Sequence, residues 1–496
     1  MIRKNILFNL IGKFWSIFSI FFFIPIYIKY LGFESYSLIS FTLIIAGFLA
    51  FLDGGLTATL SREFARKDNS LNKKKQIFKT IESSYLLIIS LCIIIVFGLS
   101  DFISNSWLKL DNLNSNDVSY FIKIISFGIG FEMLFRLYTG GLFGLEDQVK
   151  ANIYLIAWGL VRNGLVIVLI FFIPRLEAFF LWQTIVTLLF AIVLRFVCYQ
   201  SLTGFYELYS VNFNINKKIL KSIIRFTGGM FAISLISSIN SQLDKIIIST
   251  NLTIITLGYY TLATSLSMVV FVIVNPVSVA YLPRFTSLYS ENKHQEAELL
   301  FKKINSIISV ISLSIMANIV LFSEELLWIW TGDKTIAIEA STYLPIIAVA
   351  FTMLSLQVFP FNIAIANGYT KLNTTIGIIS LIITVPGYWF GIKFFGGIGA
   401  ASVFCILMIF QTLIYIYFIK IKFLKSLSLK SLFVDQLLFP LVISFATAFV
   451  FFLVDFDISN GRILSLLWVG FSSLTTILIS ASILLPVKEI IKNKYI

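Results

Sequence analysis

Long apolar stretches recur along the whole chain, and short charged or Gly-, Pro- and Asn-containing breaks separate them. An α-helix needs about 20 such residues to cross the hydrocarbon of a bilayer, where it must satisfy its own backbone hydrogen bonds. The pattern therefore predicts an all-α, polytopic membrane protein with about 14 transmembrane helices. We expect these helices near residues 7–30, 36–60, 79–99, 119–142, 151–173, 177–200, 225–248, 256–280, 304–323, 341–366, 372–393, 397–420, 434–454 and 463–485.

The low content of charge agrees with lipid as the solvent of this chain. Of its 496 residues, 58% are apolar and 13% are charged, which is too little charge to cover the surface of a soluble domain of this size. Cys92, Cys198 and Cys405 lie singly within apolar stretches, and the only histidine, His294, lies in a charged loop. Because these residues lack the spacing of a metal site, we predict no metal and no cofactor other than a coupling H⁺ or Na⁺.

Positive charges are distributed unevenly among the predicted loops. If the N-terminus is inside, 27 of the 38 Lys and Arg residues lie on the cytoplasmic side, 6 lie outside and 5 lie within the bilayer. The acidic residues divide evenly, with 11 inside, 11 outside and 3 within the bilayer. An excess of Lys and Arg on the cytoplasmic side, with no such excess of acidic residues, is what the positive-inside rule describes. We therefore expect a bacterial cytoplasmic (inner) membrane protein with both termini in the cytoplasm, whose net charge of +13 faces membrane lipids and not nucleic acid.

A short sequence pattern occurs twice, six predicted helices apart. Each copy has a Leu-Gly pair, then a Tyr-Ser-Leu or Tyr-Thr-Leu triplet, and then an arginine, 26 residues past the Tyr in the first copy and 24 in the second. The copies are Leu31-Gly32, Tyr36-Ser37-Leu38 and Arg62, and Leu257-Gly258, Tyr260-Thr261-Leu262 and Arg284. Because six helices separate them, both copies run in the same direction, as in two lobes related by an axis along the membrane normal. Chance similarity among Leu-rich helices is the alternative.

The repeat predicts four parts of the chain. Residues 1–200 form an N-lobe with helices one to six, and residues 225–420 form a pseudo-symmetric C-lobe with helices seven to twelve. The polar residues 201–224 between them form a cytoplasmic linker, and residues 421–496 add two C-terminal helices.

Several polar residues fall at bilayer depth, where an ionisable group costs several kcal/mol unless it faces a cavity or a partner. In the predicted first helix, Asn9, Lys13 and Ser16 share one face. In the predicted seventh helix the polar residues form two adjoining stripes: Ser234, Ser238, Ser241 and Lys245, and beside them Ser237, Asn240 and Asp244. So wide a polar face predicts a helix that lines a water-filled lumen.

Further charges lie in the predicted fourth and fifth helices: Lys123, Glu132, Arg136 and Arg162. Glu132 and Arg136 are four residues apart and can alternatively pair with each other. Lys123 can extend its ammonium group to the outer headgroups, and we expect Arg195 to reach the inner ones. Asp53, in Leu-Asp-Gly-Gly, either has a functional role or caps a backbone turn.

Cations at bilayer depth outnumber anions by five to three in this assignment. Apolar surroundings strengthen the attraction between Arg or Lys and a phosphate. We therefore expect a cationic lumen that binds a phosphate- or pyrophosphate-bearing headgroup. Its predicted substrate-binding residues are Lys13, Lys123, Arg136, Arg162 and Lys245.

Two segments of the chain resemble a known family. Residues 25–66 contain Leu-Gly-x-x-x-Tyr-Ser-Leu, Leu-Asp-Gly-Gly-Leu and Ser-Arg-Glu-Phe-Ala, and residues 244–263 contain Asp-Lys-Ile-Ile-Ile-Ser and Leu-Gly-Tyr-Tyr-Thr-Leu-Ala. These motifs resemble the O-antigen (Wzx-type) polysaccharide flippases of the multidrug/oligosaccharidyl-lipid/polysaccharide exporter superfamily. Many members have a Gly directly after the position of Tyr36, where this chain has Ser37.

The resemblance implies a two-lobe, alternating-access transporter that is driven by an ion gradient. It implies that an undecaprenyl-pyrophosphate-linked oligosaccharide, an O-antigen or capsule repeat unit, moves from the inner to the outer leaflet, with glycan polymerase machinery as a partner. The family keeps lumen or gate charges in the segments that hold Lys13, Arg62, Arg162, Asp244 and Lys245. We expect a gate or ion-coupling role for five residues: Asp53, Arg62, Glu132, Asp244 and Arg284. Of these, Glu132 or Asp244 is expected to bind the coupling H⁺ or Na⁺.

Two other functions suit a membrane protein of this kind. A glycan polymerase or ligase needs catalytic residues and a sizeable outer loop, whereas the longest predicted outer loops, 100–118 and 323–340, have fewer than twenty residues. A small-molecule exporter on the same scaffold favours an anionic lumen, and the excess of cations argues against it. We therefore predict a transporter that changes no covalent bond and is not an enzyme.

Overall fold

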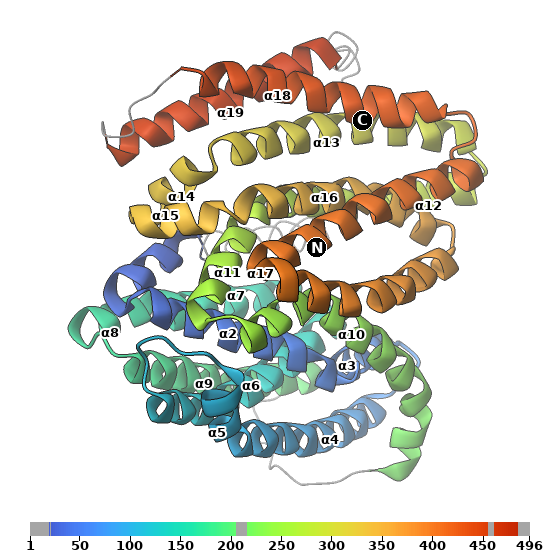
Figure 1. Ribbon diagram of the computed structural model, residues 1–496. Coiled ribbons are helices and arrows are strands. Elements are labelled where there is room, and N and C mark those ends of the chain that lie inside the picture. Colours follow the sequence, from blue (N-terminus) through green and yellow to red (C-terminus); the bar gives the residue numbers. More distant parts are fainter. Residues whose placement is uncertain (1–18, 20, 205–215, 455–460, 485–496) are drawn as a thin grey trace. The chain divides into compact units, whose positions relative to one another are not determined.

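The computed structural model describes residues 19, 21–204, 216–454 and 461–484, and this part of the chain is almost entirely helical (Figure 1). Eleven of the described helices are long and apolar enough to cross a bilayer, and one of them, α17 (Thr370–Phe423), is two helices joined at a kink. A shorter apolar helix, Phe21–Leu31, lies within the predicted first span. The prediction of an all-α, polytopic membrane protein is confirmed.

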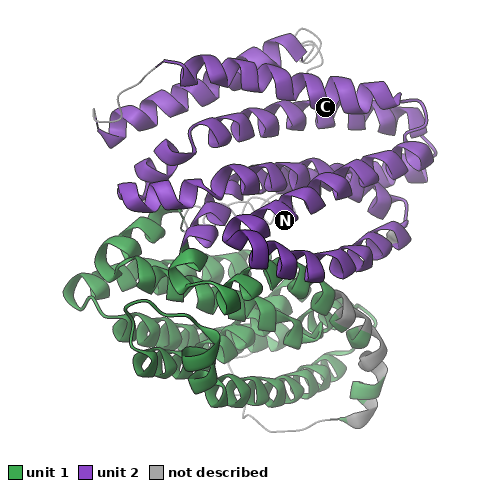
Figure 2. Ribbon diagram, viewed as in Figure 1, with its two compact units in different colours: residues 1–258 green, residues 259–496 purple. Residues whose placement is uncertain are grey.

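The chain divides into two compact units, residues 1–258 and 259–496 (Figure 2). Unit 1 contains α2 (Phe33–Leu49), η1 (Ala50–Asp53), α3 (Leu56–Ala65), α4 (Leu71–Gly98), α5 (Ser100–Phe102), η2 (Ile103–Trp107), α6 (Ser115–Gly144), α7 (Gln148–Gly159), η3 (Leu160–Gly164), α8 (Leu165–Phe172), α9 (Leu176–Thr203) and α10 (Lys217–Asn251). The next helix, α11 (Ile254–Ser267), begins in unit 1 and continues into unit 2.

Unit 2 continues with α12 (Val269–Ser290), α13 (His294–Leu321), α14 (Ser323–Thr331), α15 (Lys334–Ser341), α16 (Leu344–Ala366), α17, η4 (Ser431–Leu438), α18 (Phe439–Phe452) and α19 (Arg462–Leu484). The short helices α14 and α15 occupy the segment that we expected to be a loop. The boundaries of the predicted lobes and of their linker at 201–224 stay predictions.

Several predicted spans are interrupted helices. The span at 36–60 breaks between η1 and α3, where Gly54 and Gly55 have φ of 58° and 71°. Residues with a Cβ rarely adopt this left-handed conformation, so the Gly-Gly pair permits the break. The span at 151–173 contains a π-helical turn, η3, whereas the kink in α17 lies at Gly396, between the spans predicted at 372–393 and 397–420. These breaks are local, and they leave the predicted order of helices unchanged.

Close contact between α3 and α6 organises unit 1. A Cβ atom on Gly144 would lie 2.3 Å from the backbone oxygen of Ser61, and a Cβ atom on Gly140 would lie 2.3 Å from the Thr57 methyl group. Small residues four apart allow helices in a membrane to approach this closely, because lipid supplies no hydrophobic force that would press larger side chains together. The contact places the start of α3 beside one face of α6.

Hydrogen bonds between buried polar side chains join the last two helices of unit 2 to α13, which lies alongside them in Figure 1. The Ser314 and Ser444 hydroxyls are 3.0 Å apart, and Ser472 donates to the Asn318 side chain at 2.7 Å. Such bonds replace the hydrophobic attraction that is missing between helices in lipid. Sequence reasoning did not predict that α18 and α19 pack on α13.

Candidate substrate-binding site

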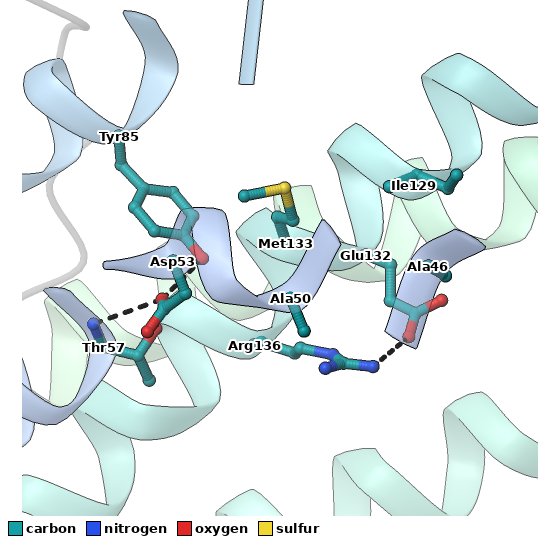
Figure 3. Close-up of a pocket in the computed structure, with 9 residues that line it drawn as sticks. All are labelled: Ala46, Ala50, Asp53, Thr57, Tyr85, Ile129, Glu132, Met133 and Arg136. Carbon is teal, nitrogen blue, oxygen red and sulfur yellow. Dashed lines mark hydrogen bonds and ion pairs between the residues drawn. The ribbon is translucent and has the colours of Figure 1, made fainter. Parts of the chain in front are cut away.

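A pocket of about 150 Å³ lies within unit 1, among α2, η1, α3, α4 and α6 (Figure 3). Three of the predicted charged residues share it. Its lining residues are Ala46, Ala50, Asp53, Thr57, Tyr85, Ile129, Glu132, Met133 and Arg136. Figure 3 shows Asp53 with Tyr85 and Thr57 at one side of the pocket, and Glu132 with Arg136 at the other.

Asp53 is fixed by hydrogen bonds at the break between η1 and α3. Its carboxylate accepts from the Tyr85 hydroxyl at 2.7 Å, from the Thr57 backbone N–H at 3.3 Å, and from the Thr57 hydroxyl. A carboxylate that accepts an N–H in the first turn of the following helix caps that helix. The alternative interpretation of Asp53 as a turn cap is therefore confirmed. Its role as a gate or coupling residue stays a prediction.

Glu132 joins two arginines that come from different elements. Its Oε1 accepts from Arg136 Nη2, one turn further along α6, at 2.7 Å, and its Oε2 lies 3.5 Å from Nη2 of Arg162 in η3. The Glu132 and Arg162 side chains are 14% and 17% exposed, whereas the Arg136 side chain is 52% exposed. The alternative of a Glu132–Arg136 pair is confirmed, and the three residues together carry one surplus positive charge.

Arg162 is held by the local structure of η3. Its guanidinium lies 4.8 Å from the centroid of the Trp158 ring, a cation–π contact. The backbone carbonyl of Arg162 accepts from the Gln183 side chain of α9 at 3.3 Å, which helps to satisfy the irregular backbone of a π turn. Within the described part of the chain, Nε of Arg162 is buried without a hydrogen-bond partner. The guanidinium therefore keeps a spare donor.

Two other predicted lumen cations have acidic neighbours outside this pocket. Lys245 Nζ lies 3.3 Å from the carboxylate of Asp244 and donates to the backbone oxygen of Ser241 at 3.1 Å. Lys123 Nζ lies 3.4 Å from the carboxylate of Asp101. The binding roles of Lys123 and Lys245 and the coupling role of Asp244 stay predictions.

The remaining predicted site residues do not line the pocket. Arg62 is exposed at the end of α3, 3.7 Å from Glu63, and Arg284 is exposed on α12 in unit 2. The predicted polar residues of α10 are half-buried or exposed: Ser234, Ser237, Ser238, Asn240 and Ser241. The predicted stripe on the first helix lies outside the described residues: Asn9, Lys13 and Ser16.

The structure corrects the interpretation of Arg195. We expected this side chain to reach the inner headgroups, but its Nε lies 2.7 Å from the carboxylate of Glu82, which also accepts from the Tyr138 hydroxyl at 2.7 Å. Burial makes this pairing necessary, because the Glu82 side chain is only 5% exposed and an unpaired charge there is costly. Sequence reasoning did not single out Glu82 and so missed the pair.

Two further site residues could have been found from spacing. Trp158 lies four residues before Arg162, so spacing along one helix brings them together, and Thr57 lies four residues after Asp53, within reach of its carboxylate across the Gly54-Gly55 break. Tyr85 carries no such signal, because its contact with Asp53 joins two separate helices.

Comparisons with known proteins agree with this fold. A family model described as "Polysaccharide biosynthesis protein" matches residues 2–289, and one described as "MatE" matches residues 230–390. Over 390 residues the chain is 22% identical to a Shigella flexneri protein described as "Putative O-antigen transporter", covering 77% of this chain and 89% of that protein.

Two solved structures show the same fold at low sequence identity. The lipid II flippase MurJ in an inward closed conformation has a TM-score of 0.74 at 18% identity, covering 96% of this chain and 98% of that one. An inward-facing multidrug resistance transporter of the MATE family has a TM-score of 0.66 at 17% identity, covering 84% of this chain and 96% of that one. Because the first family model spans more than half of the sequence, the chain belongs to the polysaccharide biosynthesis protein family.

Proposed function

We propose that this protein is a flippase that moves an undecaprenyl-pyrophosphate-linked oligosaccharide, an O-antigen or capsule repeat unit, from the inner to the outer leaflet of a bacterial cytoplasmic membrane. Membership of the polysaccharide biosynthesis family and the similarity to a protein described as an O-antigen transporter support the substrate class. The bias of Lys and Arg supports an orientation with both termini in the cytoplasm.

One observation carries the proposal: Arg136 and Arg162 share a single carboxylate beside a pocket in apolar surroundings. Each guanidinium has five N–H donors in a planar fork, and this fork suits phosphate oxygens. The two guanidinium groups attract an anionic headgroup, and a low dielectric strengthens that attraction.

In the proposed cycle the pyrophosphate binds at the two arginines while the polyprenyl tail stays in lipid. Alternating access then exposes the sugar on the outer side, and no covalent bond changes. Gate or ion-coupling roles for Asp53, Arg62, Glu132, Asp244 and Arg284 belong to this proposal, as do substrate contacts by Lys13, Lys123 and Lys245. Glycan polymerase machinery is the proposed partner that receives the flipped unit.

A strain that lacks this protein and has no redundant transporter tests the proposal. We expect lipid-linked glycan to accumulate on the cytoplasmic leaflet, and the wild-type gene to restore surface glycan. Arg162→Gln should lower the rate of flipping at least about tenfold, because it removes one charged partner from a buried site. The matched control is Lys150→Gln, which removes an exposed ion pair with Asp147 in the same unit, away from the pocket.

The outcome also separates the alternative functions. Persisting surface glycan without a stranded intermediate contradicts the flippase. A polymerase or ligase predicts the opposite phenotype, in which single repeat units reach the outer leaflet and stay unpolymerised or unattached. A small-molecule exporter predicts altered resistance to cationic drugs and normal surface glycan.

A further inference from the structure

We infer that Glu132 acts as an internal stand-in for the substrate's phosphate: its carboxylate occupies Arg136 and Arg162 when the transporter is empty, and the incoming diphosphate displaces it. This inference rests on the proposed function, because it requires an anionic headgroup at the two arginines. It assigns to Glu132 the control of binding and release, in place of direct contact with the sugar.

The geometry of the carboxylate supports this role. Glu132 uses one oxygen for each arginine, Oε1 for Arg136 at 2.7 Å and Oε2 for Arg162 at 3.5 Å. A phosphate group also presents separate oxygens to separate guanidinium groups. The contact with Arg162 is longer than the 2.7–3.2 Å of an N–H···O hydrogen bond, so Glu132 holds Arg162 by charge without a hydrogen bond.

The two arginines have more donors than Glu132 can satisfy. Arg162 Nε is buried without a hydrogen-bond partner within the described residues, while the ring of Trp158 holds the guanidinium in place. Arg136 lines the pocket and is half-exposed. A diphosphate offers several acceptor oxygens where the carboxylate offers two, so it can satisfy donors that Glu132 leaves free.

Glu132 differs in this respect from Asp53, the other carboxylate that lines the pocket. Asp53 accepts from Tyr85 and from Thr57, so donors that belong to the fold hold it in place. Glu132 has its ion pairs with the two arginines themselves. Asp53 interacts electrostatically with Arg136 but forms no ion pair with it among the described contacts, so Glu132 is the carboxylate positioned to compete with the substrate.

This competition has a consequence for the transport cycle. Two guanidinium groups without a counter-charge in apolar surroundings are costly, because each loses its hydration. A transporter that has released its substrate must return empty, and Glu132 supplies the counter-charge for that step. Glu132 should therefore be needed for net flipping and dispensable for exchange, in which the transporter returns loaded.

The test uses the purified full chain in liposomes, with labelled undecaprenyl diphosphate bearing one N-acetylhexosamine as the probe. Glu132→Gln should slow net movement of the probe about tenfold or more, the size of a typical coupling between sites, while exchange between equally loaded leaflets stays within about twofold of wild type. Inorganic pyrophosphate should inhibit this variant at a concentration about tenfold lower than it does the wild type, because no carboxylate competes.

A second variant covers the case in which Glu132→Gln does not fold. The double variant Glu132→Gln/Arg136→Gln restores a single surplus positive charge, so net flipping and exchange should differ by less than about threefold. Equal loss of net flipping and exchange in Glu132→Gln, or no loss of either, overturns the inference. If wild-type protein moves the probe in neither assay, it is the proposed function that fails. If wild type flips the probe and the variant matches it, the inference alone fails.

Discussion

At the scale of single residues, unit 1 contains two kinds of buried charge. Glu82 and Arg195 form a balanced pair, whose carboxylate also accepts from Tyr138. Glu132 is shared by two arginines, so its cluster keeps a surplus positive charge beside a pocket. A buried pair whose two charges balance favours a structural role, because removal of either partner is strongly destabilising. Arginines that share one carboxylate beside an open volume favour binding.

The balanced pair gives a prediction for stability. Arg195→Leu should destabilise the protein by about 3 kcal/mol, because it leaves the Glu82 carboxylate buried without its cation. The double variant Glu82→Leu/Arg195→Leu should cost less than the sum of the two single changes, since no uncompensated charge remains. Thermal or denaturant unfolding in detergent measures both effects. Additive losses would contradict this account of the pair.

An exposed ion pair in the same unit provides the control for that measurement. Arg66 lies 2.6 Å from Asp68 in the turn after α3, and its hydrogen bond lowers the pKa of Asp68 to about 2. A carboxyl with a lowered pKa contributes its stability above its ordinary pKa and loses it as the pH falls toward 2. The pair is thus fully ionised near neutral pH. Asp68→Asn should nevertheless change stability little, because water screens exposed pairs.

At the scale of elements, one loop forms hydrogen bonds with both of the segments that carry a copy of the sequence repeat. Glu34 in the first turn of α2 accepts from the backbone N–H groups of residues 111–113, at 2.9–3.2 Å. The same loop accepts from the N–H of Ile254, at the start of α11, through the carbonyl of Lys109 at 2.9 Å. The α2 and α11 helices also meet directly, because a Cβ atom on Gly258 would lie 1.9 Å from the Ser37 hydroxyl. Gly258 of the second copy therefore lies against Ser37 of the first.

The Glu34 contact predicts how strongly this loop is held. Glu34→Gln should speed amide hydrogen exchange at residues 111–113 about tenfold, because hydrogen bonds to a charged acceptor are worth about 1.5–3 kcal/mol and a neutral amide accepts more weakly. Burial and the Glu34 charge both raise the pKa of Asp111, so the same change should lower that pKa toward its ordinary value. Mass spectrometry of exchanged peptides measures the protection. Glu177→Gln, at the start of α9, is the matched control, and equal acceleration in both variants would remove Glu34 from this role.

At the scale of the whole molecule, the hydrophobic pattern was enough to predict the fold class but not the irregular points that shape the pocket. Apolar stretches of membrane-spanning length determine where helices lie, because a bilayer leaves few other solutions for the backbone. The break after Asp53 was visible as Leu-Asp-Gly-Gly, but the π turn at Arg162 had no comparable signal. The Glu132–Arg136 pair follows from spacing along one helix. The contact with Arg162 depends on how α6 and η3 are rotated toward each other, which packing decides.

The charge of the proposed cargo gives a prediction for the complete transport cycle. A diphosphate that links a polyprenyl chain to a sugar carries about two negative charges, and the cycle returns the protein to its starting charge. Each turnover therefore moves those two charges outward. Each charge that crosses a potential of 100 mV changes in free energy by about 2.3 kcal/mol, so a potential that is negative inside favours outward movement by about 5 kcal/mol per molecule.

In liposomes with the protein in one orientation, a potassium diffusion potential of this sign should speed inner-to-outer movement of the probe, and the opposite sign should slow it. A pH gradient without a potential should have a smaller effect. If the pH gradient drives flipping and the potential does not, protons that bind at Glu132 or Asp244 must instead move together with the headgroup and neutralise its charge.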